Sequence, residues 1–210
     1  MIHVEDWGII GFRDAWQRQS EYVEQIRSGK RSHTLILCEH PTVITLGRAG
    51  NRSNILLPEE ELERRGIDVV EINRGGDVTL HTPGQLVGYP LFNLSAMKED
   101  LHWFLREIEQ TVIDIVAEYG VESGRVDGLT GVWIGGERKI CAIGLGCSRW
   151  ISYHGFALNT TNILDEFGWI IPCGIEDKGI TSLAKETGED ISMEHLKELT
   201  SSVFTKKFSG

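Results

Sequence analysis

A single thiol, Cys173, stands between Pro172 and Gly174 in the stretch IIPCGI, residues 170–175. Proline stiffens the turn and glycine leaves the approach to the sulfur open, which suits a nucleophile. A free cysteine is also among the most buried residue types, so the same stretch fits a small apolar side chain in the core. The local sequence leaves both interpretations open.

A candidate base, Lys139, lies inside the apolar stretch ERKICAIG, residues 137–144. Burial removes the hydration that favours an ammonium ion, and a neutral amine can accept a proton from a thiol or from another amine. The alternative is an edge strand from which Lys139 extends its amine to water.

A third segment, RGGDVTLHTPGQL at residues 74–86, combines the pair Gly75-Gly76 with His81 and a second turn at Pro83-Gly84. Glycines let a ligand approach the backbone, whose exposed N–H groups can hold a carbonyl, a phosphate or an oxyanion. The segment matches neither GxxxxGK[ST] nor GxGxxG, and glycine and proline are also the ordinary residues of turns.

Composition bounds the class of protein. The chain has 210 residues, 40% of them hydrophobic and 25% charged, which predicts one globular domain over residues 1–210. The first ten residues carry acids where a signal peptide is basic, and no apolar run reaches the roughly 20 residues that span a bilayer. We therefore expect a cytoplasmic protein with no membrane partner. The four cysteines form no CxxC pair and no two histidines have the i, i+4 spacing of a helical metal site, so we expect neither metal nor cofactor.

The formal charge of −10 argues against nucleic acid as a partner, because duplex binding depends on basic residues that neutralise phosphates. The segment from Arg27 to Arg52 departs from this balance, because Glu39 is its only acid. Its basic residues are Arg27, Lys30, Arg31, Arg48 and Arg52. They fit either a basic patch for an acidic protein partner or solvated charges without a partner.

The elements that must position these groups follow from periodicity and from turn residues. Apolar residues at three-and-four spacing, ended by glycines, predict helices over residues 12–29 and 101–120. Pro58 and Gly66 bound a shorter helix, and Ser192 caps a C-terminal one. Strands are predicted at 33–40, 42–47, 67–72 and 150–160, with a hairpin over 131–147 that turns at Gly135-Gly136. This order predicts an α+β domain with a mixed or largely antiparallel sheet flanked by helices, in which Lys139 and the Gly155 region lie on neighbouring strands.

Four segments in this order along the chain resemble lipoyl(octanoyl) transferases, and the stretch EHPTVITLGR, residues 39–48, resembles the N-terminal signature of that family. The segments are Arg74-Gly75-Gly76 with Thr79, His81 and Pro83-Gly84-Gln85-Leu86; Lys139-Ile140 with Ala142-Ile143-Gly144; His154-Gly155 with Ala157-Leu158-Asn159; and Pro172-Cys173-Gly174 with Thr181-Ser182-Leu183. The resemblance covers about residues 33–185 and implies a fold similar to biotin and lipoate protein ligases.

The resemblance also implies an activity. An octanoyl or lipoyl group would pass from acyl carrier protein to a lysine of a lipoyl domain, in 2-oxoacid dehydrogenases or in the glycine cleavage H protein, and we expect a monomeric enzyme. Cys173 and Lys139 would form the catalytic dyad, through a thioester on the cysteine. The resemblance assigns acyl-substrate binding to the segments Arg74, Gly75, Gly76, Asp77, Val78, Thr79, Leu80 and His81; Ala142, Ile143 and Gly144; and Gly155, Phe156 and Ala157. Glycine and alanine there would leave a channel for an eight-carbon chain.

Departures from the family pattern occur at Leu80, Thr82 and Cys141, which could reshape the wall of the acyl pocket.

Three other functions stay open. An ATP-dependent lipoate or octanoate ligase would share the fold, but transfer from a thioester to an amine runs downhill without ATP. A cysteine hydrolase would pair Cys173 with His81 or His154, and a non-catalytic module would dock acylated carrier proteins. His81 could orient the thioester or a water, or serve packing alone.

Overall fold

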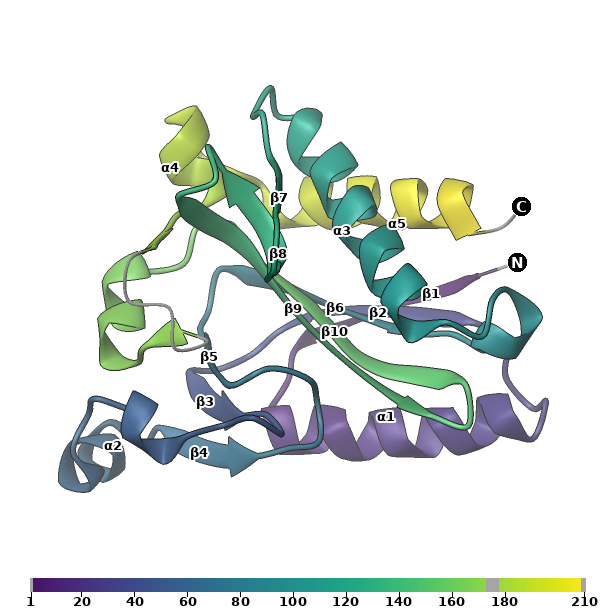
Figure 1. Ribbon diagram of the computed structural model, residues 1–210, viewed down its shortest axis with the longest axis horizontal. Coiled ribbons are helices and arrows are strands. Elements are labelled where there is room, and N and C mark those ends of the chain that lie inside the picture. The colour runs from purple at the N-terminus through teal and green to yellow at the C-terminus, as the bar shows by residue number, and fades with distance from the viewer. Residues whose placement is uncertain (1, 173–177, 209–210) are drawn as a thin grey trace.

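A computed structural model describes residues 2–172 and 178–208. Within those residues the main sheet has eight strands in the order β1-β2-β6-β10-β9-β8-β7, and β11 pairs with β9 beside that path (Figure 1). The strands are β1 (His3–Ile9), β2 (Thr34–Glu39), β6 (Gln85–Leu91), β7 (Gly124–Val126), β8 (Leu129–Ile134), β9 (Arg138–Ser148), β10 (Ile151–Asn159) and β11 (Gly179–Ile180). The β1/β2 and β11/β9 pairs are parallel and the other pairs antiparallel. The predicted mixed, largely antiparallel sheet is confirmed.

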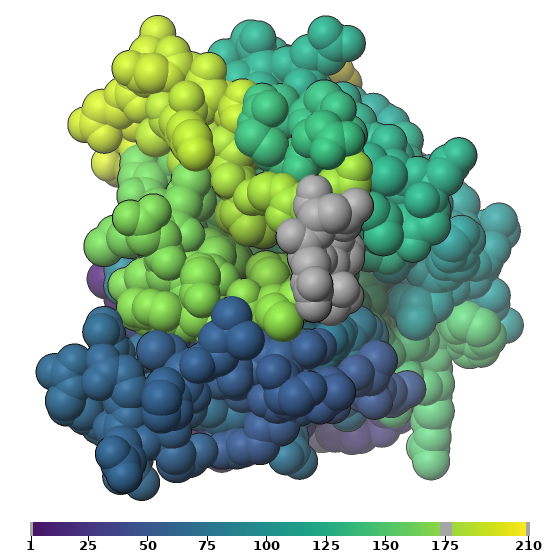
Figure 2. All heavy atoms as spheres, turned by 60° about the vertical axis from the view of Figure 1, so that its left-hand side comes forward, coloured from purple at the N-terminus to yellow at the C-terminus, as the bar shows by residue number. Residues whose placement is uncertain are grey.

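A second, smaller sheet has the order β4-β3-β5, from β3 (Val43–Leu46), β4 (Asp68–Glu71) and β5 (Val78–His81). The chain leaves the main sheet after β2 because Pro41 cannot donate a backbone hydrogen bond to a continued ladder. Helix α2 (Glu59–Arg65) leads into β4 and ends at Gly66 in the left-handed conformation. Figure 2 shows this region in blue along the lower part of the face, with residues 160–172 in green above it.

Helices cover both faces of the main sheet (Figure 1). Helix α1 (Phe12–Arg27) packs against β10 and β6, burying Ala15, Val23 and Ile26. On the opposite side, α3 (Leu101–Ala117) and α5 (Met193–Phe208) pack against each other and the sheet. The short elements are α4 (Leu183–Thr187) and the 3-10 helices Arg52–Asn54, Leu94–Ala96 and Leu164–Trp169. No helix in the described part of the chain has the length and apolar character to cross a membrane.

The local predictions agree with these elements. Helices occur where the periodicity placed them, and Gly29 and Gly120 follow α1 and α3 with φ of 72° and 71°. Gly135 and Gly136, with φ of 58° and 71°, turn β8 into β9. The side chain of Ser192 accepts the backbone N–H of His195 at 3.3 Å, as an N-terminal cap does. The separate small sheet and strand β1 were not predicted.

Three of the five basic residues between 27 and 52 have acidic partners. Arg27 pairs with Glu24 near the end of α1, Arg31 with Glu5 on β1, and Arg52 with Glu59 at the start of α2. Acids on three different elements match these three charges locally, which favours solvated charges over a continuous patch.

Candidate active site

A cavity of about 610 Å³ lies among the central strands, the segment before β5 and the start of α3. Its lining is Phe12, Ile72, Arg74, Gly75, Gly76, Thr79, His81, Val87, Tyr89, Leu101, His102, Leu105, Gly128, Leu129, Thr130, Lys139, Ala142, Ile143, Gly144, Leu145, His154, Gly155, Phe156 and Ala157. The volume falls in the range of pockets that hold small organic ligands.

Three of the sequence segments meet in this cavity. The lining includes Lys139 and all six predicted positions on β9 and β10. From the first segment it includes Arg74, Gly75, Gly76, Thr79 and His81. Asp77, Val78 and Leu80 do not line it. Side chains alternate along a strand, so Val78 and Leu80 point into the small core with Ile44, while Thr79 and His81 take the other face.

Lys139 is a buried residue of a central strand. Its relative exposure is 5%, and β9 runs between β8 and β10. Lys139 is the cross-strand partner of Trp133, and its Nζ lies 4.7 Å from the centroid of the indole ring. The alternative of an edge-strand lysine that extends to water is therefore wrong.

Cys173 lies outside the described residues, and only the chain on either side can be placed. Before it, the backbone N–H of Ile171 donates to Asn54 O at 2.8 Å. After it, β11 pairs with β9, so that Gly179 is the partner of Arg138 and Ile180 the partner of Lys139.

Arg74 is a buried cation in the wall of the cavity. Its Nη2 donates to Thr45 O at 2.8 Å and its Nη1 donates to Gly75 O at 3.0 Å. Its side chain lies so close to β9 that a Cβ on Gly144 would stand 3.0 Å from Arg74 Cδ. On the next strand, a Cβ on Gly155 would stand 1.9 Å from Gly88 O. Gly144 therefore lets Arg74 pack closely against β9, and Gly155 lets Gly88 of β6 pack closely against β10. This role differs from the open channel that their small size predicted.

Two histidines in the lining are held neutral. Burial, with lesser contributions from His40 and Arg74, lowers the pKa of His81 to about 3. Burial, followed by the charges of Arg74 and Arg48, lowers the pKa of His154 to about 3. His154 also has a φ of 57° within β10, an uncommon conformation for a residue with a side chain. Both imidazoles are weak bases at neutral pH.

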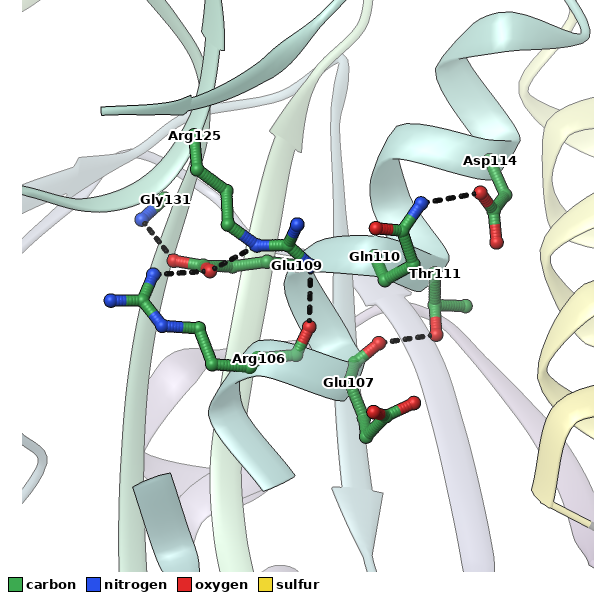
Figure 3. A network of polar contacts seen from close by, with 8 residues as sticks. All are labelled: Arg106, Glu107, Glu109, Gln110, Thr111, Asp114, Arg125 and Gly131. Carbon is green, nitrogen blue, oxygen red and sulfur yellow. Dashed lines mark hydrogen bonds and ion pairs between the residues drawn. The ribbon is translucent and has the colours of Figure 1, made fainter. Parts of the chain in front are cut away.

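A buried carboxylate supports the wall next to Lys139 (Figure 3). Glu109 of α3 has no exposed side-chain surface, and it accepts hydrogen bonds from Arg106 at 2.6 Å and Arg125 at 3.0 Å. Its other oxygen accepts the backbone N–H of Gly131 on β8 at 3.0 Å. A Cβ on Gly131 would stand 3.6 Å from Lys139 Cε, so this anchor lies directly behind the lysine.

The departures from the family pattern fall outside the cavity lining. Leu80 and Cys141 are fully buried in core clusters, and burial raises the pKa of the Cys141 thiol well above its ordinary value. Thr82 donates a hydrogen bond to Glu166. None of the three reshapes the wall directly.

The sequence did not identify the part of the lining that comes from α3 and from Gly128 and the first two residues of β8. Leu101 and Leu105 belong to the apolar periodic residues of α3, from which only the helix itself was predicted. Gly128, Leu129 and Thr130 carry no motif, so nothing in their types marked them. Among the described residues, no group of three or more histidines, cysteines or acids is placed to hold a metal ion.

The arrangement of sheets and helices is that of the lipoate and biotin protein ligase fold. A bi-partite lipoate protein ligase from Thermoplasma acidophilum superimposes with a TM-score of 0.75 at 14% identity, over 99% of this chain and 83% of that one. A biotin protein ligase from Aquifex aeolicus gives a TM-score of 0.55 at 12% identity, over 100% of this chain and 70% of the other. At such identities the likeness concerns the fold alone.

Sequence similarity is more specific. An octanoyltransferase of Cytophaga hutchinsonii is 43% identical over 94% of this chain and 88% of its own length. The lipoyl protein ligase A/B catalytic domain matches residues 12–205, and the chain belongs to that family. The predicted resemblance and fold are thereby confirmed.

Proposed function

We propose that this chain transfers an octanoyl or lipoyl group from acyl carrier protein to a lysine of lipoyl domains, including those of 2-oxoacid dehydrogenases and the glycine cleavage H protein. The observation that carries the proposal is the buried Lys139 in the wall of a cavity of about 610 Å³, in a chain 43% identical to an octanoyltransferase. The protein works as a monomer and needs no nucleotide.

In the first step Lys139 accepts the proton of the Cys173 thiol, and the thiolate attacks the carbonyl carbon of the carrier thioester. The bond between that carbon and the pantetheine sulfur breaks, and Lys139 returns the proton to the departing thiolate. In the second step the acceptor amine attacks the Cys173 thioester and gives its proton to Lys139, while the Cys173 thiolate leaves. The Trp133 ring supports both steps, because an aromatic face attracts the ammonium ion that each one forms.

The described residues next to Cys173 support the pairing of the two groups. Strand β11 follows Cys173 in the sequence and lies alongside β9 at Lys139. The imidazoles offer a weaker alternative base. With pKa values of about 3, His81 and His154 draw little proton from a thiol at neutral pH, which disfavours a cysteine hydrolase built on either of them.

Intact-mass spectrometry after mixing with octanoyl carrier protein tests the proposal. The chain should gain one octanoyl group, and Cys173→Ala should abolish the gain. Lys139→Ala should slow it by about 10²- to 10⁴-fold, the usual worth of a general base. Cys147→Ala, at a partly exposed cysteine outside the cavity, is the matched control and should acylate normally.

Other outcomes identify the rival functions. Modification of a lipoyl domain with free octanoate and ATP, but not with octanoyl carrier, would establish a ligase. Release of free octanoate faster than its transfer to the acceptor would establish a hydrolase. Retention of full function in Cys173→Ala would leave only a docking module.

A further inference from the structure

A chain of side-chain amides connects the backbone at Lys139 to the imidazole of His81. It begins at Thr181, whose backbone N–H donates to Lys139 O at 3.0 Å. The carbonyl of Thr181 accepts a hydrogen bond from Asn159 Nδ2 at 2.9 Å. A backbone carbonyl can only accept, so the amino group of Asn159 must face Thr181 and its oxygen must face the other way.

The next two links fix the orientation of Gln85. Asn159 Oδ1 accepts Gln85 Nε2 at 2.9 Å and Asn162 Nδ2 at 3.2 Å. Asn162 is itself oriented, since its oxygen accepts the backbone N–H of Thr160 at 3.1 Å. Gln85 Nε2 also donates to the carbonyl of Leu80 at 3.4 Å, a second group that can only accept. The amino group of Gln85 is therefore turned away from His81.

The last link determines the tautomer of His81. Gln85 Oε1 lies 2.8 Å from His81 Nδ1, and an amide oxygen can only accept, so Nδ1 carries the proton. The ring is neutral because burial disfavours its charged form. Nε2 therefore has a lone pair and no proton. Among the described residues no hydrogen bond reaches Nε2, and the ring lines the cavity.

Aromatic neighbours hold the imidazole plane in place. The Phe12 ring stacks on it, with centroids 5.7 Å apart and planes at 15°, and the His40 ring meets it edge-on at 5.6 Å. A ring turned over by 180° would place Cδ2 where Nδ1 now lies and would lose the bond to Gln85.

We propose that His81 accepts a hydrogen bond from the incoming lysine amine and directs the amine lone pair at the thioester. The assignment rests on the proposed function and goes beyond it. A thioester carbonyl oxygen, or the oxyanion formed from it, needs a hydrogen-bond donor, which an unprotonated Nε2 cannot be. A neutral amine has N–H groups to donate as well as a lone pair to attack. Of the two reacting groups, the thioester carbonyl and the amine, only the amine can donate to the nitrogen that His81 presents.

The tautomer can be tested without any activity measurement. A long-range ¹H–¹⁵N correlation spectrum of the full chain with ¹⁵N-labelled histidine, assigned with His81→Gln, should show His81 protonated at Nδ1 near pH 7. Gln85→Met removes the acceptor, and the preference for Nδ1 should weaken. A wild-type ring protonated at Nε2, or at both nitrogens, would overturn the assignment.

The role is tested by timing the two half-reactions separately. Asparagine at position 81 retains a donor for Gln85 but reaches only the Nδ1 position, whereas glutamine can place its oxygen near Nε2. His81→Asn should slow transfer from isolated acyl-enzyme to the lipoyl domain about tenfold more than it slows acyl-enzyme formation, the worth of one hydrogen bond. His81→Gln should recover part of the loss. Equal slowing of both steps, or slowing of the first alone, would refute the role.

The same experiment separates failure of this inference from failure of the proposed function. If wild-type chain forms no acyl-enzyme with octanoyl carrier, the proposed function fails, whatever the tautomer of His81. If acyl-enzyme forms and His81→Asn passes it to the acceptor at the wild-type rate, only the role of His81 fails.

Discussion

The carboxylate of Glu109 accepts the backbone N–H of Gly131 at 3.0 Å, although none of its surface reaches solvent. Glu109→Leu removes the partner of two arginines and leaves the Gly131 N–H unsatisfied, so the free energy of unfolding should fall by about 2–3 kcal/mol. Glu109→Gln keeps one acceptor and should lose about half as much. Urea denaturation measures both.

The control for Glu109 lies on the same helix. Glu107 pairs with Lys207 at 3.0 Å and is partly exposed, so Glu107→Gln should change the free energy of unfolding by less than about 0.5 kcal/mol. Equal losses in the Glu107 and Glu109 variants would mean that the buried network contributes no more than a surface pair.

The two neutral histidines predict acid sensitivity. His81 and His154 have pKa values of about 3 in the folded chain against 6.5 when unfolded, because burial disfavours the imidazolium. Below pH 6.5 the unfolded chain binds protons that the folded chain does not bind. The free energy of unfolding therefore decreases as the pH is lowered from 6.5 to about 3, and these two groups do not change it above pH 6.5. Each histidine contributes a slope of about 1.4 kcal/mol per pH unit.

His154→Asn isolates one of these contributions, because asparagine tolerates the φ of 57° at this position. Denaturation curves of the variant should show a free energy of unfolding that depends less steeply on pH between 6.5 and 5, by about 1.4 kcal/mol per pH unit. An unchanged slope would show that His154 is protonated equally in both states.

A strained turn offers a gain in stability. Arg149 and Trp150 connect β9 to β10 as a two-residue turn with φ of 48° and 62°. Such a turn favours asparagine or glycine, so Arg149→Asn should raise the free energy of unfolding by about 0.5–1 kcal/mol. Arg149→Ala retains the strain and should bring no gain; a matching gain would point to removal of charge instead.

The aromatic face beside Lys139 bears on the chemistry. Trp133→Phe keeps a ring under the amine and Trp133→Leu does not, so acyl-enzyme formation should be several-fold slower in the leucine variant, for about 1 kcal/mol of cation–π stabilisation. Quenched-flow mass spectrometry measures the rate, and circular dichroism confirms that both variants fold. Equal rates would remove Trp133 from the proposed mechanism.

Local signals predicted most of the helices and the β8–β9 hairpin, because apolar periodicity and terminal glycines are properties of neighbouring residues. The smaller sheet could not be predicted in the same way. Its strands pair across a long insertion that contains α2, and short strands carry no local mark of which partner they choose.

In the candidate site, too, local motifs predicted some residues, whereas others depend on the assembled fold. The motifs located Lys139 and the strands beside it, yet the segment 74–81 alternates between cavity and core, and the sequence did not show which residues face which side. The series of hydrogen bonds from Thr181 through Asn159 and Gln85 to His81 joins residues far apart in sequence. The directions of these hydrogen bonds are therefore defined only when the strands are assembled.

The ring of Phe156 occupies the space that a Cβ on Gly88 would need, at 2.2 Å, and stacks on Phe204 of α5 with centroids 5.5 Å apart. Phe156 also lines the cavity, whereas Phe204 does not. Phe204 of α5 thus supports one wall of the cavity from behind. Under the proposed function the cavity holds the acyl chain, so a changed preference for shorter or longer fatty acids can be sought by resizing Phe204, a residue that does not itself line the cavity.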